Sequence, residues 1–469
     1  MTERHALLVD IGSTYTKVVD VDLERAAVAL QGKSVTTVEE DVTLGLERAL
    51  TDAGIASQSL GGYSLRLACS SAAGGLSLTA IGLVPELTAE AARRAALGAG
   101  AVVRQVYSYC LTPKDIAQIR AMEPDIILLV GGTDGGESST IVHNAALLAK
   151  SRIHAPIIVA GNRNAAGRVM EILRREDMDV RLTDNVMPRL NLLNVEPAQE
   201  AIREVFLERI VKAKGLDRVQ QMLQAVAMPT PSAVLAAARL LADGEGEEDG
   251  WGDLLVVDVG GATTDVHSIA EGGPGGTDVI YRGLPEPRLK RTVEGDLGLR
   301  INAAPLFAAL GESRVRKLMG GSGKSDLSEL VDRLSRDCSH IPQSEEEWAL
   351  EAALGRGAVE LAVARHAGEV EELLTPQGRK LFQRGKDLTE VATAIGTGGI
   401  FAHHPQAWEM LRGVQTNQDP FLLAPKRAQL CLDRDYIMWA AGLLSDAEPL
   451  AALRLLKRCL ICGEEHGQT

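Results

Sequence analysis

The sequence predicts a mixed α/β protein that contains two related domains. Short apolar runs, such as residues 126–130, alternate with alanine-rich stretches such as residues 86–97, as in parallel strands joined by crossover helices. An apolar strand that ends in Asp-x-Gly and a threonine-rich turn occurs twice, at Asp10 and at Asp258, about half the chain apart. The length of 469 residues is roughly three times that of a common single domain. A duplicated domain is the simplest interpretation.

Composition and charge exclude several classes of protein. Hydrophobic residues make up 45% and charged residues 24% of the chain, which is ordinary for a globular protein and excludes a disordered or fibrous one. The formal net charge of −14 opposes attraction to nucleic acid or to an anionic membrane, so we expect neither as a partner. Six scattered cysteines, a start without an apolar signal stretch and the lack of a membrane-length apolar run predict a reduced, cytoplasmic protein.

The first half is expected to open with a β-meander. The runs ALLVDIG and VVDVD, joined by the turn STYTK, predict two strands, and residues 27–30 predict a third. Four further apolar runs, LRLACSS, VVRQVYS, DIILLVGG and PIIVAGN, predict strands that alternate with helices. Apolar residues at helical spacing predict a helix over 197–212, and helical character is expected to continue to about Leu241.

The second half is expected to repeat this opening. The acidic, glycine-rich residues 243–252 lack apolar periodicity and predict an exposed connection, so we place the domain boundary there, with domains at 1–245 and 246–469. The strand LLVVDVGG restarts the pattern, and a helix-rich region follows over about 301–374. A short segment, VATAIGTGG, precedes two stretches with helical spacing at 436–444 and 450–460.

Each Asp-x-Gly turn carries the groups that a polyphosphate and its metal ion need. A carboxylate at the end of a buried strand lies at the edge of a sheet, and small turn residues let backbone N–H groups approach an anion closely. Two facing turns could hold a polyphosphate and Mg²⁺ between them, whereas either turn alone is equally well explained as an ordinary hairpin. The candidates in the first turn, beside Asp10, are Gly12, Ser13, Thr14, Thr16 and Lys17. Those in the second, beside Asp258 and Asp265, are Gly260, Gly261, Ala262, Thr263 and Thr264.

A glycine-rich segment supplies a third candidate wall of a nucleotide site. It follows the strand-like run VATA and comprises Gly396, Thr397, Gly398 and Gly399. Bare backbone at these positions could lie against an adenosine or a ribose. Glycine-rich turns are common, so it is the position of this segment after the second Asp-x-Gly turn that favours the interpretation.

In this order the three segments resemble the phosphate-1, phosphate-2 and adenosine motifs of the actin, Hsp70 and sugar kinase superfamily. More narrowly, blocks spread over most of the chain resemble the accessory protein family called MutL or GlmL, which is associated with adenosylcobalamin-dependent glutamate mutase and related aminomutases. These blocks include LVPELTAEAARRAALGAGA, NVMPRLNLLNVEPA, VVDVGGATTDVHS, KRTVEGDLG and DYIMWAAGLLS. Nothing in the sequence resembles the ATPase motifs of the unrelated mismatch-repair protein that shares the name MutL.

The resemblance implies duplicated ribonuclease H-like domains, as in actin and Hsp70, with a nucleotide cleft between them. It implies an ATP-binding accessory protein, a chaperone or reactivase with weak ATPase activity, whose partners are subunits of an adenosylcobalamin-dependent mutase, and it leaves a homo-oligomer open. ATP or ADP would bind with Mg²⁺, held directly or through water by Asp10 and Asp258, one of which would orient the attacking water. The resemblance implies that the phosphates are contacted by Thr14, Thr16, Lys17, Gly260, Gly261 and Thr263. It implies that the adenosine is contacted by Gly396, Gly398 and Gly399.

Two other functions remain open on the same fold. A small-molecule kinase would use an aspartate as a base toward a substrate hydroxyl, and a nucleotide-regulated scaffold would catalyse nothing. The matching blocks that lie far from the nucleotide motifs favour the accessory protein, and no sugar-binding signature supports the kinase.

Several smaller motifs have competing interpretations. The loop GGTDGG could present Asp134 to a ligand or be a plain strand-to-helix turn, and Glu294 or Asp296 could stand near the nucleotide or at a solvated helix start. Residues 320–325 lack the first glycine of a Walker A loop, and the CxxC at 459–462 is too isolated to predict a zinc site.

Overall fold

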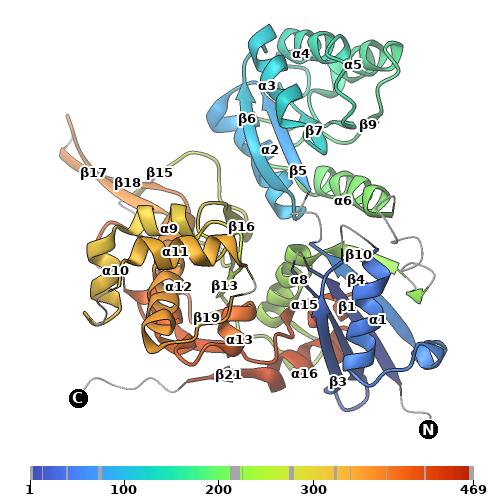
Figure 1. The fold of residues 1–469 in the computed structure, drawn as a ribbon. Helices are drawn as coiled ribbons and strands as arrows, with labels where there is room; N and C mark the ends of the chain where they lie inside the picture. Colours follow the sequence, from blue (N-terminus) through green and yellow to red (C-terminus); the bar gives the residue numbers. More distant parts are fainter. Residues whose placement is uncertain are drawn as a thin grey trace. The chain divides into compact units, whose positions relative to one another are not determined.

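The computed structural model forms two compact α/β units, which confirms the predicted fold class (Figure 1). The described residues are 4–12, 14–37, 41–71, 76–211, 222–223, 225–273, 279–321, 325–338, 340–376, 378–416 and 419–463. The units comprise Met1–Ala233 and Val234–Thr469, so the division falls inside helix α8 (Thr230–Asp243). No helix within the described residues is long and apolar enough to cross a membrane.

The first unit opens with the β-meander expected from the sequence. Its strands are β1 (His5–Ile11), β2 (Tyr15–Asp22), β3 (Ala27–Val35), β4 (Leu65–Ser70) and β10 (Ala225–Pro229), in the order β10-β4-β1-β2-β3. The first three strands pair antiparallel, whereas β4 pairs in parallel with β1 and β10 pairs in parallel with β4. Helix α1 (Val42–Asp52) packs on β2 and β3, and Gly32 permits this, because a Cβ there would lie 2.4 Å from the Ala49 carbonyl oxygen.

Between β4 and β10 the chain forms a second, fully parallel sheet in the order β6-β5-β7-β8-β9. Its strands are β5 (Ser77–Gly82), β6 (Val102–Ser108), β7 (Ile126–Leu129), β8 (Ile157–Val159) and β9 (Val180–Leu182). The helices between and after them include α2 (Glu90–Gly98), α3 (Pro113–Met122), α4 (Ser139–Ala149), α5 (Arg163–Arg175) and α6 (Glu196–Val211). The predicted alternation of strands and helices is therefore confirmed.

The expectation of continuous helix from α6 to Leu241 is wrong in its middle. Strand β10 occupies Ala225–Pro229, and α8 begins only after it. A short apolar run without charges fits a buried strand as well as a buried helix, and pairing with β4 decides between them. The segment thereby becomes the fifth strand of the first sheet.

The second unit repeats the topology of the first sheet, as the sequence predicts. Its strands are β13 (Leu254–Val259), β14 (Thr264–Ile269), β16 (Leu289–Glu294), β19 (Thr393–Thr397), β20 (Gln429–Asp433) and β21 (Leu460–Cys462), in the order β16-β14-β13-β19-β20-β21. The first three form an antiparallel meander, and β19 and β20 continue the sheet in parallel with β13. Apart from the edge strand β21, each neighbour and direction matches the first sheet. Two copies of one plan fit the ribonuclease H-like architecture that the resemblance implies.

Helices pack closely on the second sheet. The longest, α12 (Glu345–His366), lies on β13 and β14, and a Cβ at its Gly357 would stand 2.4 Å from Leu310. Further helices are α9 (Ala303–Leu310), α10 (Glu312–Leu318), α11 (Leu327–Arg336), α13 (Gly399–His403), α14 (Ala407–Leu411), α15 (Met438–Leu444) and α16 (Pro449–Cys459). The helix-rich region ends before residue 374, because β17 (Glu369–Thr375) pairs with β18 (Gly378–Arg384), which also pairs with β15 (Val279–Arg282).

The acidic segment at 243–252 forms a short hairpin of β11 (Gly244–Glu245) and β12 (Glu248–Asp249). The Glu248 carboxylate accepts hydrogen bonds from Arg454 Nε at 2.9 Å and from Lys457 Nζ at 3.3 Å, both on α16. The hairpin is thus bound to the second unit, and the boundary placed between residues 245 and 246 lies within it.

The expectation that all cysteines are reduced is wrong for one pair. Cys431 of β20 and Cys462 of β21 form a disulfide between two antiparallel strands, in which they are register partners. Their positions in the sequence carry no sign of this, since only strand pairing brings them together. The other cysteines within the described residues, Cys69, Cys110, Cys338 and Cys459, are thiols.

Candidate functional site

Asp10 lies near the end of β1, among three hydrogen-bond donors, and is 1% exposed. Lys17 Nζ donates to its Oδ2 at 2.9 Å, and the Thr230 hydroxyl donates to its Oδ1 at 2.7 Å. The Cys69 thiol also approaches Oδ1, at 3.6 Å. Lys17 is the register partner of Asp10 on β2, Cys69 is its partner on β4, and Thr230 begins α8. Segments from both ends of the first unit therefore converge on this carboxylate.

Burial raises the pKa of the Cys69 thiol well above its usual range, and the negative charge of Asp10 raises it further. The thiol is therefore protonated at neutral pH, where it acts as a weak hydrogen-bond donor. A protonated, buried thiol is a poor nucleophile, so Cys69 supports Asp10 and supplies no covalent chemistry.

The first turn is closed by a hydrogen bond from Gly12 N to the Tyr15 carbonyl oxygen, at 3.0 Å. A Cβ at Gly12 would lie 2.6 Å from the same oxygen, so only glycine fits at this position. Thr14 is exposed, and Ser13 lies outside the described residues. The described part of the turn therefore combines a buried, tightly closed glycine with an exposed threonine that could reach an anion.

Thr16 is placed apart from the other predicted residues of this turn. Its side chain is fully buried, and its hydroxyl bonds to the Thr36 hydroxyl at 3.0 Å. Because successive residues of a strand point to opposite faces, Thr16 and Lys17 lie on opposite sides of β2. The Thr16 hydroxyl is therefore directed into the interior of the unit and away from Lys17.

The second turn repeats the closure of the first. Gly260 N donates to the Thr263 carbonyl oxygen at 2.9 Å. The Gly261 carbonyl oxygen accepts from Arg300 N at 2.8 Å, which fixes the turn to the segment after β16. Gly261 is exposed, and Gly260, Ala262 and Thr263 are partly exposed. The segment after β16 therefore holds the second turn in place, while Gly261 of the turn stays exposed to solvent.

Thr264 takes the position that Thr16 has in the first hairpin. It is fully buried, and its hydroxyl donates to the Leu297 carbonyl oxygen at 2.6 Å. In both hairpins the threonine after the turn therefore anchors the strand from within.

Asp258 is the partly exposed counterpart of Asp10, in a different electrostatic environment. Its register partner on β14 is Asp265, at the place that Lys17 takes in the first hairpin. Arg291 Nε donates to Asp265 Oδ1 at 2.8 Å, and both of these side chains are nearly buried. Arg291 thereby neutralises Asp265, so Asp258 does not stand beside an unpaired negative charge.

The glycine-rich segment lies directly against Asp258. Strand β19 pairs in parallel with β13, which makes Thr397 the register partner of Asp258. Gly398 has a φ of +102°, and a Cβ there would lie 2.6 Å from Asp258 Oδ1. The structure therefore brings the predicted phosphate and adenosine segments of the second half into contact.

The other residues of the glycine-rich segment divide between interior and surface. Gly396 is buried against the Phe401 ring, which would lie 2.9 Å from a Cβ at this position. Thr397 Oγ1 donates to Asp433 Oδ2 at 2.8 Å, and both residues are fully buried. Gly399, at the start of α13, is the exposed member of the segment.

Sequence reasoning missed two polar residues, Thr230 and Asp433, each of which stands at the end of the fifth strand of its sheet or just after it. Asp433 accepts from two backbone N–H groups at the start of α15, at 2.8 Å and 3.0 Å, and burial raises its pKa. The signal that could have found both is topological. In the first sheet β10 pairs with β4, and β4 pairs with β1, which carries Asp10. In the second sheet β20 pairs with β19, and β19 pairs with β13, which carries Asp258. The ends of β10 and β20 therefore lie near these two aspartates.

The acidic residues of the smaller motifs bond to other residues of the chain. Asp134 Oδ1 accepts from Asn185 Nδ2 at 2.9 Å and from the backbone at the start of α5, which favours a plain strand-to-helix turn. Glu294 and Asp296 pair with Arg365 at 2.9 Å and 2.6 Å, and this hydrogen bonding lowers the pKa of Asp296. Within the described ranges, no group of three or more His, Cys, Asp and Glu residues could hold a metal ion.

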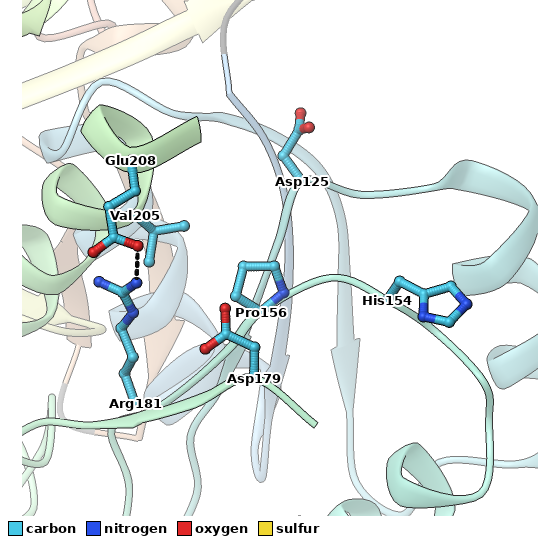
Figure 2. Close-up of a pocket in the computed structure, with 7 residues that line it drawn as sticks. All are labelled: Asp125, His154, Pro156, Asp179, Arg181, Val205 and Glu208. Carbon is cyan, nitrogen blue, oxygen red and sulfur yellow. Dashed lines mark hydrogen bonds and ion pairs between the residues drawn. The ribbon is translucent and has the colours of Figure 1, made fainter. Parts of the chain in front are cut away.

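A separate cavity lies in the first unit, at the amino ends of β7, β8 and β9 (Figure 2). Its volume is about 470 Å³, and its polar lining consists of Asp125, His154, Asp179, Arg181 and Glu208. Arg181 is ion-paired with Glu208 of α6, and Figure 2 shows the two side chains pointing toward each other. The cavity contains none of the predicted site residues, so we do not assign the nucleotide to it.

Two solved structures that resemble this chain do so at low scores. An activator of the 2-hydroxyisocaproyl-CoA dehydratase from Clostridium difficile, with bound ADPNP, is 10% identical, with a TM-score of 0.31 and coverage of 97% of each chain. A glycerol dehydratase reactivase is 11% identical, with a TM-score of 0.34, over 94% of this chain and 100% of that one. The fold is defined by the strand order of the two sheets.

The similarity in sequence is much stronger. The family described as MutL protein matches residues 6–460. Protein MutL of Clostridium tetanomorphum is 45% identical over 460 residues, which cover 97% of this chain and 99% of the relative. On this evidence the chain belongs to the MutL protein family.

Proposed function

We propose that this protein binds ATP with Mg²⁺, hydrolyses it slowly and thereby acts on an adenosylcobalamin-dependent mutase. The observation that supports nucleotide binding is the repetition of an aspartate before a glycine turn on the central strand, Asp10 with Gly12 and Asp258 with Gly260. Both turns are closed by the same type of hydrogen bond, and each carries a described small residue that is exposed, Thr14 in the first and Gly261 in the second. Such turns suit phosphate groups, because backbone N–H groups can approach the anion closely.

The phosphates of the nucleotide are assigned to the two turns. Lys17 supplies a cation beside the first carboxylate, and its side chain is 21% exposed, so it can turn toward a phosphate. We assign further phosphate contacts to Gly12, Thr14, Gly260, Gly261, Ala262 and Thr263, and Ser13 stays in this set as a prediction. The Thr16 and Thr264 hydroxyls support the hairpins from within.

The adenosine is assigned to the outer end of the glycine-rich segment. Gly398 touches the Asp258 carboxylate, and Gly399 is exposed beside it. Gly396 packs against Phe401, and Thr397 bonds to Asp433. We therefore assign these two residues a supporting role and no direct contact with the adenosine.

The donor set fits the magnesium ion that accompanies a nucleotide. Carboxylate oxygens, water and phosphate oxygens are the ligands that Mg²⁺ prefers, and a bound ion would neutralise charge on the phosphates. Asp10 is enclosed by protein donors, whereas Asp258 is partly exposed. We therefore assign the orientation of the attacking water to Asp258, and we assign Asp10 a contact to the ion through water.

The mutase partner is inferred from membership of the MutL family and from the resemblance to mutase accessory proteins. A chaperone or reactivase must couple its nucleotide state to its partner. The mutase should then change nucleotide affinity, and the nucleotide should change mutase affinity by the same factor. We place this activity in the cytoplasm.

Calorimetry and a coupled assay test the proposal. The protein is titrated with ATP and with ADP, with and without Mg²⁺, and ATP hydrolysis is followed with and without a cobalamin mutase that holds inactivated cofactor. We expect binding that requires Mg²⁺, a low basal rate that the mutase stimulates, and recovery of mutase activity with Mg·ATP and free adenosylcobalamin. Absence of binding at millimolar nucleotide contradicts the proposal. ATP consumption that ignores the mutase and phosphorylates a small hydroxylated metabolite would establish a kinase instead.

A further inference from the structure

We infer that Thr230 is a positioning residue for Asp10, whose buried carboxylate oxygen it holds so that the other oxygen serves the nucleotide site. The inference rests on the proposed function. Thr230 comes from the start of α8, 220 residues along the chain from Asp10, and belongs to none of the predicted nucleotide motifs.

The hydrogen bond between the two residues has a defined direction. Thr230 Oγ1 lies 2.7 Å from Asp10 Oδ1. An ionised carboxylate can only accept, so the hydroxyl donates. Thr230 is 7% exposed and Asp10 is 1% exposed, so water hardly competes for either group. Hydrogen bonds to an ionised acceptor are shorter and stronger than neutral ones.

The two oxygens of the Asp10 carboxylate have different surroundings. Oδ1 faces Thr230 and Cys69, both of which are buried. Oδ2 faces Lys17, whose side chain is partly exposed. If Lys17 turns to a phosphate, Oδ2 loses its donor and Thr230 becomes the main group that fixes the carboxylate. The Cys69 thiol cannot replace it, because a thiol at 3.6 Å is a weak donor.

The backbone around Thr230 holds its hydroxyl in place before any ligand binds. The residue stands between Pro229, the last residue of β10, and Pro231. Proline fixes its own φ and restricts the residue before it, and a β-branched side chain has few accessible χ1 rotamers. The Pro-Thr-Pro sequence therefore presents the hydroxyl with little conformational freedom left to lose.

A valine and a serine at this position separate the hydroxyl from the shape of the side chain. Thr230→Val keeps the shape and removes the donor, and Thr230→Ser keeps the donor. Ser232→Ala is the matched control, because Ser232 is a buried hydroxyl two residues further along α8 that donates to the Ala99 carbonyl oxygen at 3.1 Å. Steady-state ATP hydrolysis is measured over a range of ATP and of Mg²⁺, and thermal unfolding of each variant is followed by circular dichroism.

We expect Thr230→Val to lower kcat by about 10- to 100-fold, the scale of one hydrogen bond to a charged group, and to raise the half-saturating Mg²⁺ concentration. The KM for ATP should stay within about threefold, since the phosphate-binding turn is intact. Thr230→Ser should recover most of kcat, and Ser232→Ala should match the parent.

A folded Thr230→Val with the parent kcat and Mg²⁺ dependence overturns the inference, as does a serine variant no better than the valine one. Should the valine variant fail to fold, Thr230→Ala, which adds no bulk, gives the same comparison. A parent protein that binds no nucleotide overturns the proposed function and this inference with it, whereas an active parent with an unaffected Thr230→Val overturns only the inference.

Discussion

Alanine at Gly398 should destabilise the second unit and displace Asp258, whereas alanine at the adjacent Gly399 should leave the stability of the unit unchanged. Gly398 has a φ of +102° and a ψ of 162°, a backbone region that is essentially restricted to glycine. A Cβ there would lie 2.6 Å from Asp258 Oδ1 and 2.8 Å from the Val259 carbonyl oxygen. At Gly399 a Cβ would meet no described atom within 4 Å. Both variants add a single methyl group, but only the one at Gly398 strains the backbone and its neighbours.

Two unfavourable terms combine in Gly398→Ala. The backbone conformation costs a non-glycine residue about 1–3 kcal/mol. The contacts with Asp258 and Val259 add an overpacking term of about 1–3 kcal/mol, because the Val259 carbonyl belongs to the central strand β13 and cannot rotate away. We expect a total loss of about 2–6 kcal/mol in the free energy of unfolding of the second unit.

Urea unfolding followed by circular dichroism and the initial rate of ATP hydrolysis test this reasoning together. Moving the Asp258 carboxylate should reduce turnover even in the fraction of Gly398→Ala that stays folded, whereas Gly399→Ala should keep the parent stability to within about 1 kcal/mol. Parent-like stability in Gly398→Ala would refute the backbone argument. Parent-like turnover per folded molecule would refute the proposed dependence of turnover on the contact between Gly398 and Asp258.

Three further predictions concern single side chains. Asp258→Ala should lower ATP turnover by about 100-fold or more in a steady-state assay while calorimetry still detects nucleotide, and unchanged turnover would contradict its assigned role. Lys17→Met should weaken Mg·ATP binding in calorimetry by about tenfold or more and lower the melting temperature, because it leaves the Asp10 carboxylate buried without its cation. Burial and the neighbouring Arg291 lower the pKa of His267 from 6.5 to about 3, so the unfolded chain binds this proton first and stability is lost as pH falls through that interval. His267→Leu should therefore unfold at a lower pH than the parent in an acid titration followed by circular dichroism.

The local features of the candidate site were predictable because each one occupies a short stretch of sequence. A strand, an aspartate and a glycine turn occupy about ten consecutive residues, and the apolar run and the small residues are visible without knowledge of the fold. The duplication was visible for the same reason, since Asp10 and Asp258 occur in matching local patterns. Strand order then confirmed that the two stretches hold equivalent positions.

The surroundings of the two aspartates were not predictable, because parallel pairing assembles them from distant segments. Cys69 and Thr230 reach Asp10 through β4 and β10, and β10 itself was expected to be helical. Arg291 reaches Asp265 through the pairing of β14 with β16. No spacing in the sequence encodes these contacts, so the sequence pattern predicts the two candidate aspartates but not the groups that surround them.

The difference between the two hairpins argues for separate tasks within one duplicated plan. In the first, the cross-strand partner of the aspartate is a lysine that pairs with it, and Thr230 closes the other side. In the second, the partner is Asp265, whose charge is cancelled by Arg291, which leaves Asp258 partly exposed. A carboxylate already held by a cation and a hydroxyl is suited to fixed support, whereas a partly exposed one beside a neutralised neighbour can engage water. Restoring symmetry by Asp265→Lys should therefore impair turnover more than nucleotide binding, because it would place a new cation beside Asp258 and against Arg291.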